Sequence, residues 1–382
     1  MNTLIQIIGI LVLSSFVNID SINPSNIDLK NAHHPVYTIR VDDKEKYFDW
    51  DQFIKIEQII PLETNSNSVM GNPDKVYVSK DNMFLQDRKN HSLKVFDMAG
   101  KFLYNVGNKG KGPEEYLEMR DFMITDNNIY ILDYKKIHCF DASNGKYKSN
   151  FNITTQEMNP ICFLVFGSND YYLWQSNPSQ KNARDSKFRL LKFEEGKLKS
   201  KYFKYEHHSN DMNRFFKRPD GSFYMRPIDG EYDIYKITKD SVSISFELNF
   251  DNKNLPKDYF IKNPINVDNE YLKSDYYKSI ADIFETKDYI YFTCAGPQSY
   301  AYEGLISKKT NQISFGKRDF SSNPRIIYSD GNYLYGYYQP SLILKEPVKK
   351  IQHLFFDEIK NYLKDLKVED NIIIVKYSLK DK

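Results

Sequence analysis

The sequence predicts an all-β repeat fold, and three observations support this prediction. The chain of 382 residues is rich in Tyr and Phe, with 30 and 26 copies, but has only 16 Gly and 2 Trp. Tyr and Phe suit the half-buried face of a pleated sheet, so this composition favours strands. Short runs of alternating apolar and polar residues recur along the chain, and the best-preserved repeats have a period of about 40 to 50 residues, which is typical of propeller blades. Together these features predict a six-bladed β-propeller of four-stranded antiparallel blades, closed by N- and C-terminal strands, with two helical insertions.

The length of the chain fits this architecture. On length alone, 382 residues suggest two or three domains. A propeller grows by adding blades, each with its own core layer, so one domain can reach this size. We therefore expect residues 51–382 to form the propeller, after a polar, turn-rich lead-in at residues 22–50.

Residues 1–21 are predicted to be a signal peptide or an N-terminal apolar targeting segment. The uncharged run Leu4–Val17 has 14 residues, whereas a membrane-spanning helix needs about 20. It matches the apolar core of a secretory signal, with Ser21 as the best cleavage candidate, although no Lys or Arg precedes it. No cysteine follows the run, so we expect no lipid anchor. The prediction is an exported protein, periplasmic, extracellular or of the cell envelope; the alternative is a buried N-terminal strand or helix.

Two stretches align as consecutive units of the repeat. Phe96 and Phe140 are 44 residues apart, and Gly100 and Gly145 are 45 apart. In both units an Asp follows the Phe, where it can bond the next backbone amides, and the Gly can take a positive φ, so a turn is expected. The apolar runs of the two units are 75–78, 83–87, 93–97 and 100–103, and then 121–124, 129–133, 137–141 and 145–147.

Four further units are less regular, but each contains alternating runs separated by turn residues. They contain the runs 170–174 and 188–193; 221–226 and 232–237; 289–293, 302–306 and 312–315; and 325–328 and 332–338.

The two ends of the propeller region have the composition of strands. Phe53–Leu62 precedes the first complete unit, and Asn371–Leu379 lies near the C-terminus. Closed propellers commonly complete one blade with strands from both chain ends, which leaves no exposed lateral edge. We expect these two segments to share a blade.

Two segments show apolar residues at helical spacing, near 271–286 and near 348–366. We expect helices that pack on the face or flank of the propeller. The alternative is a lid or a partner-binding helix.

The sequence also resembles a known group of proteins. The resemblance is carried by Ile60-Pro-Leu-Glu-Thr64, by the Phe96-Asp-x-x-Gly100-Lys-Phe-Leu step, and above all by Gly107-Asn-Lys-Gly-Lys-Gly-Pro-Glu-Glu-Tyr116. These residues look like the six-bladed β-propeller proteins of Bacteroides-type bacteria, which are relatives of the NHL-repeat propellers. The resemblance covers nearly the whole chain after about residue 50 and implies the fold. It implies little about activity, because most members have no established one, and the lipoprotein cysteine of many members is absent here.

The glycine-rich run Gly107–Gly112 is the most distinctive motif. It lacks the Gly-Lys-Ser/Thr ending of a Walker loop and the βαβ context of a dinucleotide site. We interpret it as the connection from the outer strand of one blade to the inner strand of the next. Such connections lie near the channel mouth, so the residues that follow could reach a ligand, the alternative being a conformational joint with solvated carboxylates. The candidates here are Glu114, Glu115, Tyr116 and Arg120, with Asp121 beside them.

Three further candidates for ligand binding follow from residue type and position. Arg88, Trp174 and Arg226 lie in or just after predicted inner strands and offer forked donors or a flat stacking surface. Asp87 and Asp133 occupy equivalent repeat positions, which favours a structural, turn-capping role.

No cofactor and no metal site are predicted. Cys139, Cys162 and Cys294 are far apart, without C-x-x-C or matching His spacing, and are expected to be buried free thiols, with a single disulfide as the alternative. None of the seven His forms a spaced ligand pair such as H-E-x-x-H. A metal site assembled from several blades remains the alternative.

The charges of the chain bear on its partners. With 53 basic and 51 acidic residues, the net charge is +2, which gives no cationic footprint for nucleic acid. We expect a protein, peptide or glycan ligand and no stable membrane span after signal cleavage. The oligomeric state cannot be read from the sequence.

The leading functional hypothesis is a non-enzymatic binding or scaffold module of the cell envelope, with its ligand on the loop face near the channel mouth. Tyr combines stacking with hydrogen bonding, which suits such a role. The alternative is a metal-dependent hydrolase or lyase that uses the channel, and fold analogy does not choose between them. A third hypothesis is a purely structural subunit.

Overall fold

The structure is a computed structural model. It describes residues 33–40, 46–125, 127–153, 159–167, 169–175, 188–204, 214–226, 228–256, 259, 269–319, 325–344 and 365–380. The predicted targeting segment at residues 1–21 lies outside the described residues, as does the predicted helix near 348–366 except for its last two residues.

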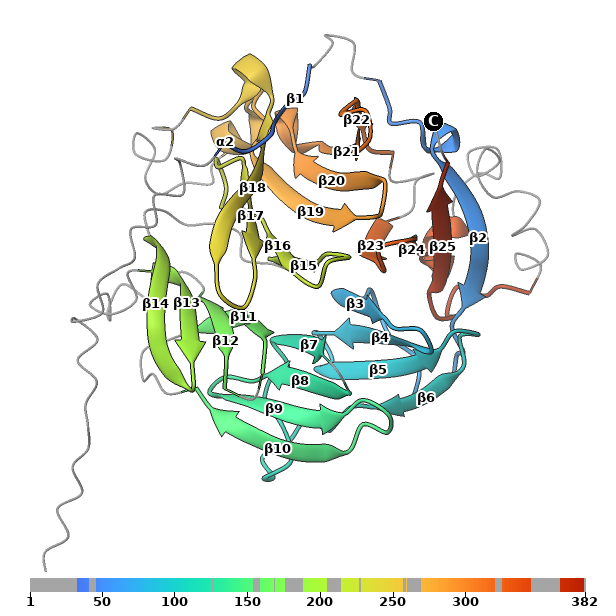
Figure 1. The fold of residues 1–382 in the computed structure, drawn as a ribbon. Helices are drawn as coiled ribbons and strands as arrows, with labels where there is room; N and C mark the ends of the chain where they lie inside the picture. Colours follow the sequence, from blue (N-terminus) through green and yellow to red (C-terminus); the bar gives the residue numbers. More distant parts are fainter. Residues whose placement is uncertain are drawn as a thin grey trace, which may run out of the picture.

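The described strands form six sheets arranged as the blades of a ring (Figure 1). Each blade has four antiparallel strands, which are consecutive in sequence in the first five blades. The early part of the chain adds a fifth strand to one of these blades and supplies the outer strand of the sixth. Blade 1 consists of β3 (Lys75–Val78), β4 (Asn82–Asp87), β5 (Ser92–Asp97) and β6 (Phe102–Asn105), and blade 2 of β7 (Asp121–Thr125), β8 (Asn128–Leu132), β9 (Lys136–Asp141) and β10 (Tyr147–Asn152). Blade 3 consists of β11 (Pro160–Val165), β12 (Tyr171–Gln175), β13 (Phe188–Glu194) and β14 (Lys197–Lys204), and blade 4 of β15 (Phe215–Lys217), β16 (Phe223–Met225), β17 (Asp233–Ile237) and β18 (Val242–Asn249). Blade 5 consists of β19 (Ser279–Glu285), β20 (Tyr289–Ala295), β21 (Ala301–Ser307) and β22 (Ile313–Lys317), and blade 6 of β23 (Arg325–Ser329), β24 (Leu334–Tyr338), β25 (Ile373–Leu379) and β2 (Ile54–Pro61).

The predicted turns of the first two blades form as expected. Asp97 Oδ1 accepts from the backbone N–H groups of Ala99 and Lys101, both at 2.9 Å, and Gly100 has a φ of 87°. The same arrangement recurs in blade 2, where the Asp141 carboxylate accepts from the Ser143 amide. A side chain at Gly100 would meet the backbone of blade 6, so glycine is required for both conformation and space.

Blade 6 closes the ring with strands from distant parts of the chain. β2 pairs antiparallel with β25, with Ile60 opposite Ile374, and β25 pairs in turn with β24. Figure 1 shows the early strand β2 and the late strand β25 side by side. The predicted closure by N- and C-terminal strands is therefore confirmed.

Part of the polar lead-in is also paired with the blades. β1 (Val36–Thr38) adds to blade 4 as a fifth strand, parallel to β18. Further on, Phe48 and Lys317 of blade 5 are joined by a backbone hydrogen bond of 2.9 Å, and the 3-10 helix η2 (Trp50–Gln52) leads into β2. We call residues 36–38 and 46–53 the N-terminal strap, because they contact blades 4 and 5 before the chain enters blade 6.

The prediction of a helix near 271–286 is wrong for most of these residues. The structure has a short helix α2 (Asn269–Lys273) there, followed by the inner strand β19. The register of β19 against β20 shifts between Ile280 and Ile283, so a bulge interrupts the alternation of the strand. Ile280, Ile283 and Phe284 are all buried. Their positions at i, i+3 and i+4 are the spacing expected of a helix, although the segment is a strand.

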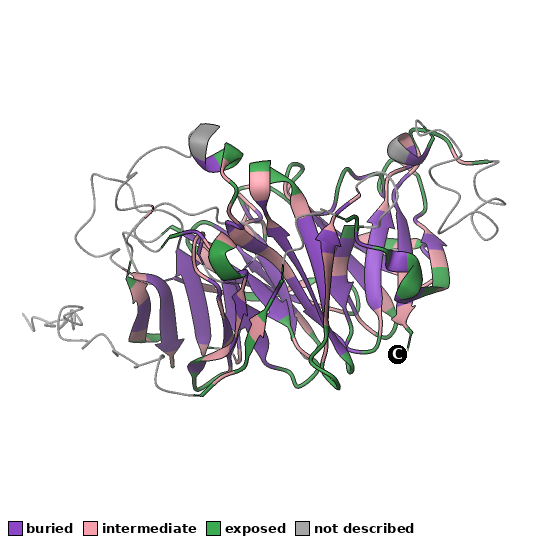
Figure 2. Cartoon of the chain, turned by 90° about the horizontal axis from the view of Figure 1, so that it is seen from above, coloured by how far each residue is buried: buried purple, intermediate pink, exposed green. Residues whose placement is uncertain are grey.

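The other described helices are short: η3 (Asp251–Lys253), η4 (Pro297–Ser299) and α3 (Pro340–Ile343). Seen from the side, the buried strands fill the middle of the molecule, and exposed segments lie mainly at its two faces (Figure 2). The core is divided into clusters that each span neighbouring blades. Cys139, Cys162 and Cys294 are buried free thiols, as predicted.

Candidate functional site

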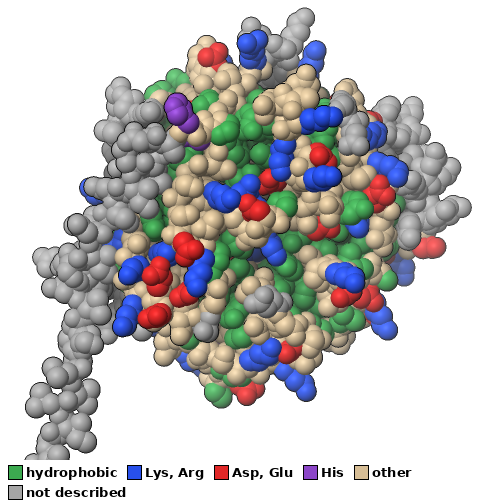
Figure 3. Space-filling view, in the orientation of Figure 1, with side chains coloured by type: hydrophobic (Ala, Val, Ile, Leu, Met, Phe, Trp, Pro, Cys, Tyr) green, Lys and Arg blue, Asp and Glu red, His purple; other side chains and the backbone are tan. Residues whose placement is uncertain are grey.

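The inner strands of the blades surround a central channel pocket. β3, β7, β11, β15, β19 and β23 are neighbours around the ring, and each contributes residues to one cavity of about 80 Å³ that opens to solvent. Figure 3 shows the molecule hollowed near its centre, with hydrophobic and basic side chains beside the hollow.

Aromatic rings form much of the wall of this pocket. Tyr77 packs against Tyr328 at 5.4 Å between ring centroids, and Phe216 meets Phe284 edge to face at the same distance. The lining also includes Phe122, Phe215 and Phe223. Rings from several different blades thus face one cavity and can stack on a flat ligand.

One cation of the pocket joins two blades. The Lys75 ammonium group forms a 2.7 Å ion pair with Asp121, at the start of β7, and donates to the Phe122 carbonyl at 2.8 Å. Asp121 is buried, and its other carboxylate oxygen accepts from the Phe163 amide of blade 3. This pair is therefore part of the scaffold of the channel.

A second cation is more accessible. Lys217, at the end of β15, is exposed and donates to the Tyr77 hydroxyl at 3.2 Å, with its ammonium group 5.1 Å from the centre of the Tyr77 ring. This contact crosses the channel from blade 4 to blade 1. A ligand in the pocket would meet both the cation and the phenol.

Arg325 and two carboxylates complete the polar part of the lining, with Asp74 before β3 and Asp282 on β19. Burial works to lower the pKa of Arg325, but Tyr337, Asp282 and Asp74 raise it, and the net pKa is raised. Asp282 also accepts from the Thr293 hydroxyl at 3.1 Å. The pocket therefore offers hydrogen-bond donors and acceptors next to its aromatic walls.

Two of the predicted site residues are buried between blades, Trp174 between blades 3 and 4 and Arg226 between blades 4 and 5. The indole of Trp174 is 1% exposed, and the Arg214 guanidinium lies over it at 4.3 Å. Arg226 is 6% exposed and donates to the Ile280 carbonyl of blade 5 at 3.2 Å. These side chains join blades, and neither lines the channel pocket.

Arg88 lies directly after the end of β4 in blade 1, and Arg120 lies between blades 2 and 3. The backbone N–H of Arg88 donates to Asp74 at 2.7 Å, which ties the end of β4 to the entry of β3. Arg120 donates to the Pro160 carbonyl of blade 3 at 2.9 Å, and its guanidinium lies 4.7 Å from the centre of the Tyr134 ring.

The glycine-rich loop connects β6 to β7, as predicted, and lies against the outer strands of blade 2. A groove there is lined by residues of the loop and by Phe140, Lys146 and Tyr147. Glu115 folds back and accepts from the Gly112 amide at 2.8 Å, Tyr116 is 1% exposed, and Glu114 is exposed. The structure does not bring these three residues to the channel pocket.

The residues that do converge in the channel were missed by the sequence analysis, apart from Asp121 beside Lys75. Asp74, Lys75, Asp282 and Arg325 lie at or beside inner strands, and Lys217 ends one. The available signal was a charged residue in or beside the first strand of most units, as with Lys75, Lys217 and Arg325. Among the described residues, one group of side chains could hold a metal ion, namely His34, Asp233 and Glu247 at the outer edge of blade 4.

The ring of six blades defines the class of this protein: it is a six-bladed β-propeller. The chain belongs to the family described as "Domain of unknown function (DUF4934)", whose model matches residues 34–378. We found no match to the sequence among curated proteins.

Two solved structures are similar in fold. The crystal structure of a "Putative exported protein" from Bacteroides fragilis NCTC 9343 has a TM-score of 0.75 at 17% identity, covering 91% of this chain and 100% of that one. A member of the duf4221 family from Bacteroides vulgatus ATCC 8482 has a TM-score of 0.52 at 10% identity, covering 87% of this chain and 100% of that one. At these identities the likeness shows the fold alone. In the part of the chain that the structure describes, no helix is long and apolar enough to span a membrane.

Proposed function

We propose that this protein is an exported, non-enzymatic binding module of the cell envelope, with its ligand in the channel pocket near the mouth of the propeller. The observation that carries the proposal is the pocket itself, which residues from all six blades line and where aromatic rings and charged groups from five of them face one cavity. Export is supported by the apolar segment at residues 4–17 and by the likeness to the B. fragilis protein.

A glycan is the ligand class that this lining favours over a peptide or protein segment. Sugar hydroxyls both donate and accept hydrogen bonds, so they can use Asp74 and Asp282 as acceptors and Lys217 and Arg325 as donors. The C–H face of a sugar ring can lie on an aromatic wall such as Tyr77. Pockets of this mixed kind fix a ligand's orientation with few polar groups.

The position of the possible metal ligands favours binding over metal-dependent hydrolysis in the channel. Among the described side chains, those that could hold a metal meet at the rim of blade 4 and not in the channel. A metal-dependent hydrolase would need its ligands to converge beside the substrate.

A labelled glycan array tests the proposal. The wild-type protein should bind a defined subset of glycans, and Lys217→Ala or Arg325→Ala should weaken binding at least about tenfold, as expected for losing a charged hydrogen bond. Both side chains are exposed, so the fold should survive, and Lys101→Ala, at an exposed turn, is the matched control. Equal binding by wild type and channel variants would refute the site. If the protein bound peptides from a library and no glycan, the ligand would be a peptide. Release of cleaved sugar would show that the protein is an enzyme.

A further inference from the structure

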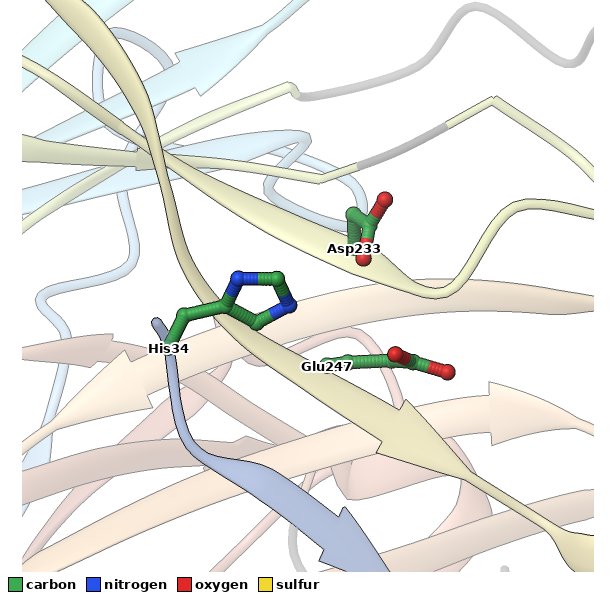
Figure 4. Close-up of side chains that lie close together, drawn as sticks. All are labelled: His34, Asp233 and Glu247. Atoms are coloured by element: carbon green, nitrogen blue, oxygen red, sulfur yellow. The ribbon is translucent and has the colours of Figure 1, made fainter. Parts of the chain in front are cut away.

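The outer edge of blade 4 brings together one imidazole and two carboxylates from three separate segments. His34 precedes β1, Asp233 begins β17 and Glu247 lies in β18. One ligand atom from each residue lies within 4.8 Å of the other two. Figure 4 shows the imidazole ring of His34 directed toward both carboxylates. All three residues are partly exposed, so an ion in solvent could reach them.

The strand register explains why these side chains meet. Asp233 and Glu247 are direct cross-strand partners in the antiparallel pair β17–β18. Val36 of β1 lies opposite Glu247 in the parallel pair on the other side of β18, and the Glu247 amide donates to the Pro35 carbonyl at 2.9 Å. Because side chains alternate along an extended chain, His34 is on the same face as Val36 and diagonal to Glu247.

The charges of this cluster favour a cation. Like charges directly opposite each other on neighbouring strands destabilise a sheet. Among the described residues, no Lys or Arg forms an ion pair with the carboxylate of Asp233 or Glu247. Glu231, two residues before Asp233 in the chain, adds a further acidic residue beside this strand. The surroundings are therefore acidic, and a bound cation would offset the repulsion.

We propose that His34, Asp233 and Glu247 form a binding site for a first-row divalent transition-metal ion such as Zn²⁺. An imidazole beside two carboxylates suits such ions, whereas Ca²⁺ and Mg²⁺ prefer oxygen ligands alone. With bonds of about 2.0 to 2.2 Å from Zn²⁺ to nitrogen or oxygen, two ligand atoms of a tetrahedral site lie about 3.3 to 3.6 Å apart. Small side-chain rotations from the separation seen here would bring all three groups onto one ion.

The bound ion would hold the start of the N-terminal strap against blade 4. His34 stands immediately before β1, whereas the two carboxylates belong to the body of blade 4. β1 has only three residues, so its pairing with β18 is short. An ion that binds the folded protein but not the separated segments stabilises the fold by mass action. This inference does not depend on the ligand of the channel.

Titration of the metal-free protein with Zn²⁺ tests the site. Protein made from the full chain is stripped with a chelator, and calorimetry should then show one equivalent of Zn²⁺ bound, with a rise in the thermal unfolding midpoint. Binding should fall at least tenfold in each of the variants His34→Ala, Asp233→Asn and Glu247→Gln. Bound Zn²⁺ should also slow protease cleavage within residues 33–40 in the wild type, and not in these variants.

The controls separate this site from other metal-binding side chains. His33→Ala removes the adjacent, exposed histidine, which should point to the opposite face, and should leave the Zn²⁺ response unchanged. Asp233→Asn and Glu247→Gln keep the shape of the side chain and remove repulsion, so both should fold without metal, which circular dichroism can verify. The proposal is wrong if the wild type shows no saturable uptake of Zn²⁺, or if uptake is the same in all three ligand variants.

Discussion

The indole N–H of Trp50 donates a 2.9 Å hydrogen bond to the carboxylate of Glu303, a residue 253 positions further along the chain. Glu303 is 0% exposed, and its other oxygen accepts from the Tyr291 hydroxyl at 3.0 Å. The N-terminal strap is thus joined to the interior of blade 5 by a buried hydrogen bond. A buried carboxylate that loses a donor retains its full desolvation cost.

Replacing Trp50 with Phe should therefore destabilise the protein by about 1 to 3 kcal/mol, because the substitution keeps an aromatic ring but removes the N–H group that donates to Glu303. Urea unfolding followed by circular dichroism measures the change. Tyr47→Phe is the control, since Tyr47 is 63% exposed on the same segment. Equal stability of Trp50→Phe and the wild type would show that the bond adds nothing.

Deletion of residues 369–382 should abolish soluble folding. It removes β25, which lies between β24 and β2, so blade 6 would lose the strand that joins its two halves. Soluble yield and size-exclusion chromatography provide the measurement. Deleting only Asp381 and Lys382 removes no part of β25 and should leave folding intact. A soluble, compact protein from the longer deletion would contradict the closing role.

Gly316→Ala should loosen the strap from blade 5. A Cβ atom at this position would lie 2.7 Å from the Phe48 nitrogen and 2.8 Å from the Lys46 carbonyl oxygen, and backbone atoms cannot move aside as a flexible side chain does. We expect a loss of about 1 to 3 kcal/mol, the usual cost of overpacking, and faster proteolysis near residue 47. Gly71→Ala is the matched control, because nothing lies within 4 Å of its added Cβ. Unchanged proteolysis in Gly316→Ala would mean that the strap is held elsewhere.

Glu285→Gln should show a stability loss that depends on pH. Glu285 is buried and accepts from Arg218 and Lys308, both at 2.6 Å. Burial works to raise the pKa of Glu285, but the two hydrogen bonds lower it, and the net pKa lies below its ordinary value of 4.5. A carboxylate with a lowered pKa in the folded state stabilises the protein above its unfolded pKa, and this contribution is lost as the pH falls through the folded value.

The expected loss for Glu285→Gln is about 3 to 5 kcal/mol at pH 7, because two cations lose their buried partner. Below pH 4.5 the difference from the wild type should shrink. Urea unfolding at pH 7 and at pH 3.5 measures it. The exposed Asp288→Asn, close by in sequence, should show little change at either pH. A loss that is the same at both pH values would rule out the ionised carboxylate as its cause.

Much of the fold could be predicted because propeller blades repeat a local pattern. The Phe-Asp step of β5 and β9 recurs with its turn glycine, and the apolar runs of β2 and β25 show strand composition near both chain ends. The helix predicted at 271–286 failed because the bulge between Ile280 and Ile283 places buried residues at helical intervals. The periodicity of apolar residues alone cannot distinguish a helix from a strand with a bulge.

The channel pocket could not be predicted in the same way. Asp74 and Arg325 are far apart in the chain and become neighbours of one cavity only when the ring closes. Residue chemistry and position in or just after predicted inner strands selected Trp174 and Arg226 as ligand-binding candidates instead. In the structure both are buried, with their polar or aromatic groups used between blades.

The position of the strap has a consequence for how the molecule assembles. Residues 36–38 pair with residues 247–249, and β2 needs β25, which ends at Leu379. During synthesis, β1 and β2 therefore cannot form these pairs until β18 and β25 have been made. Contacts of such wide sequence separation are slow to form, so synthesis from the N-terminus cannot complete this fold step by step. A chain kept extended until its last strand is made would avoid premature pairing, and this requirement is compatible with threading through a translocation pore.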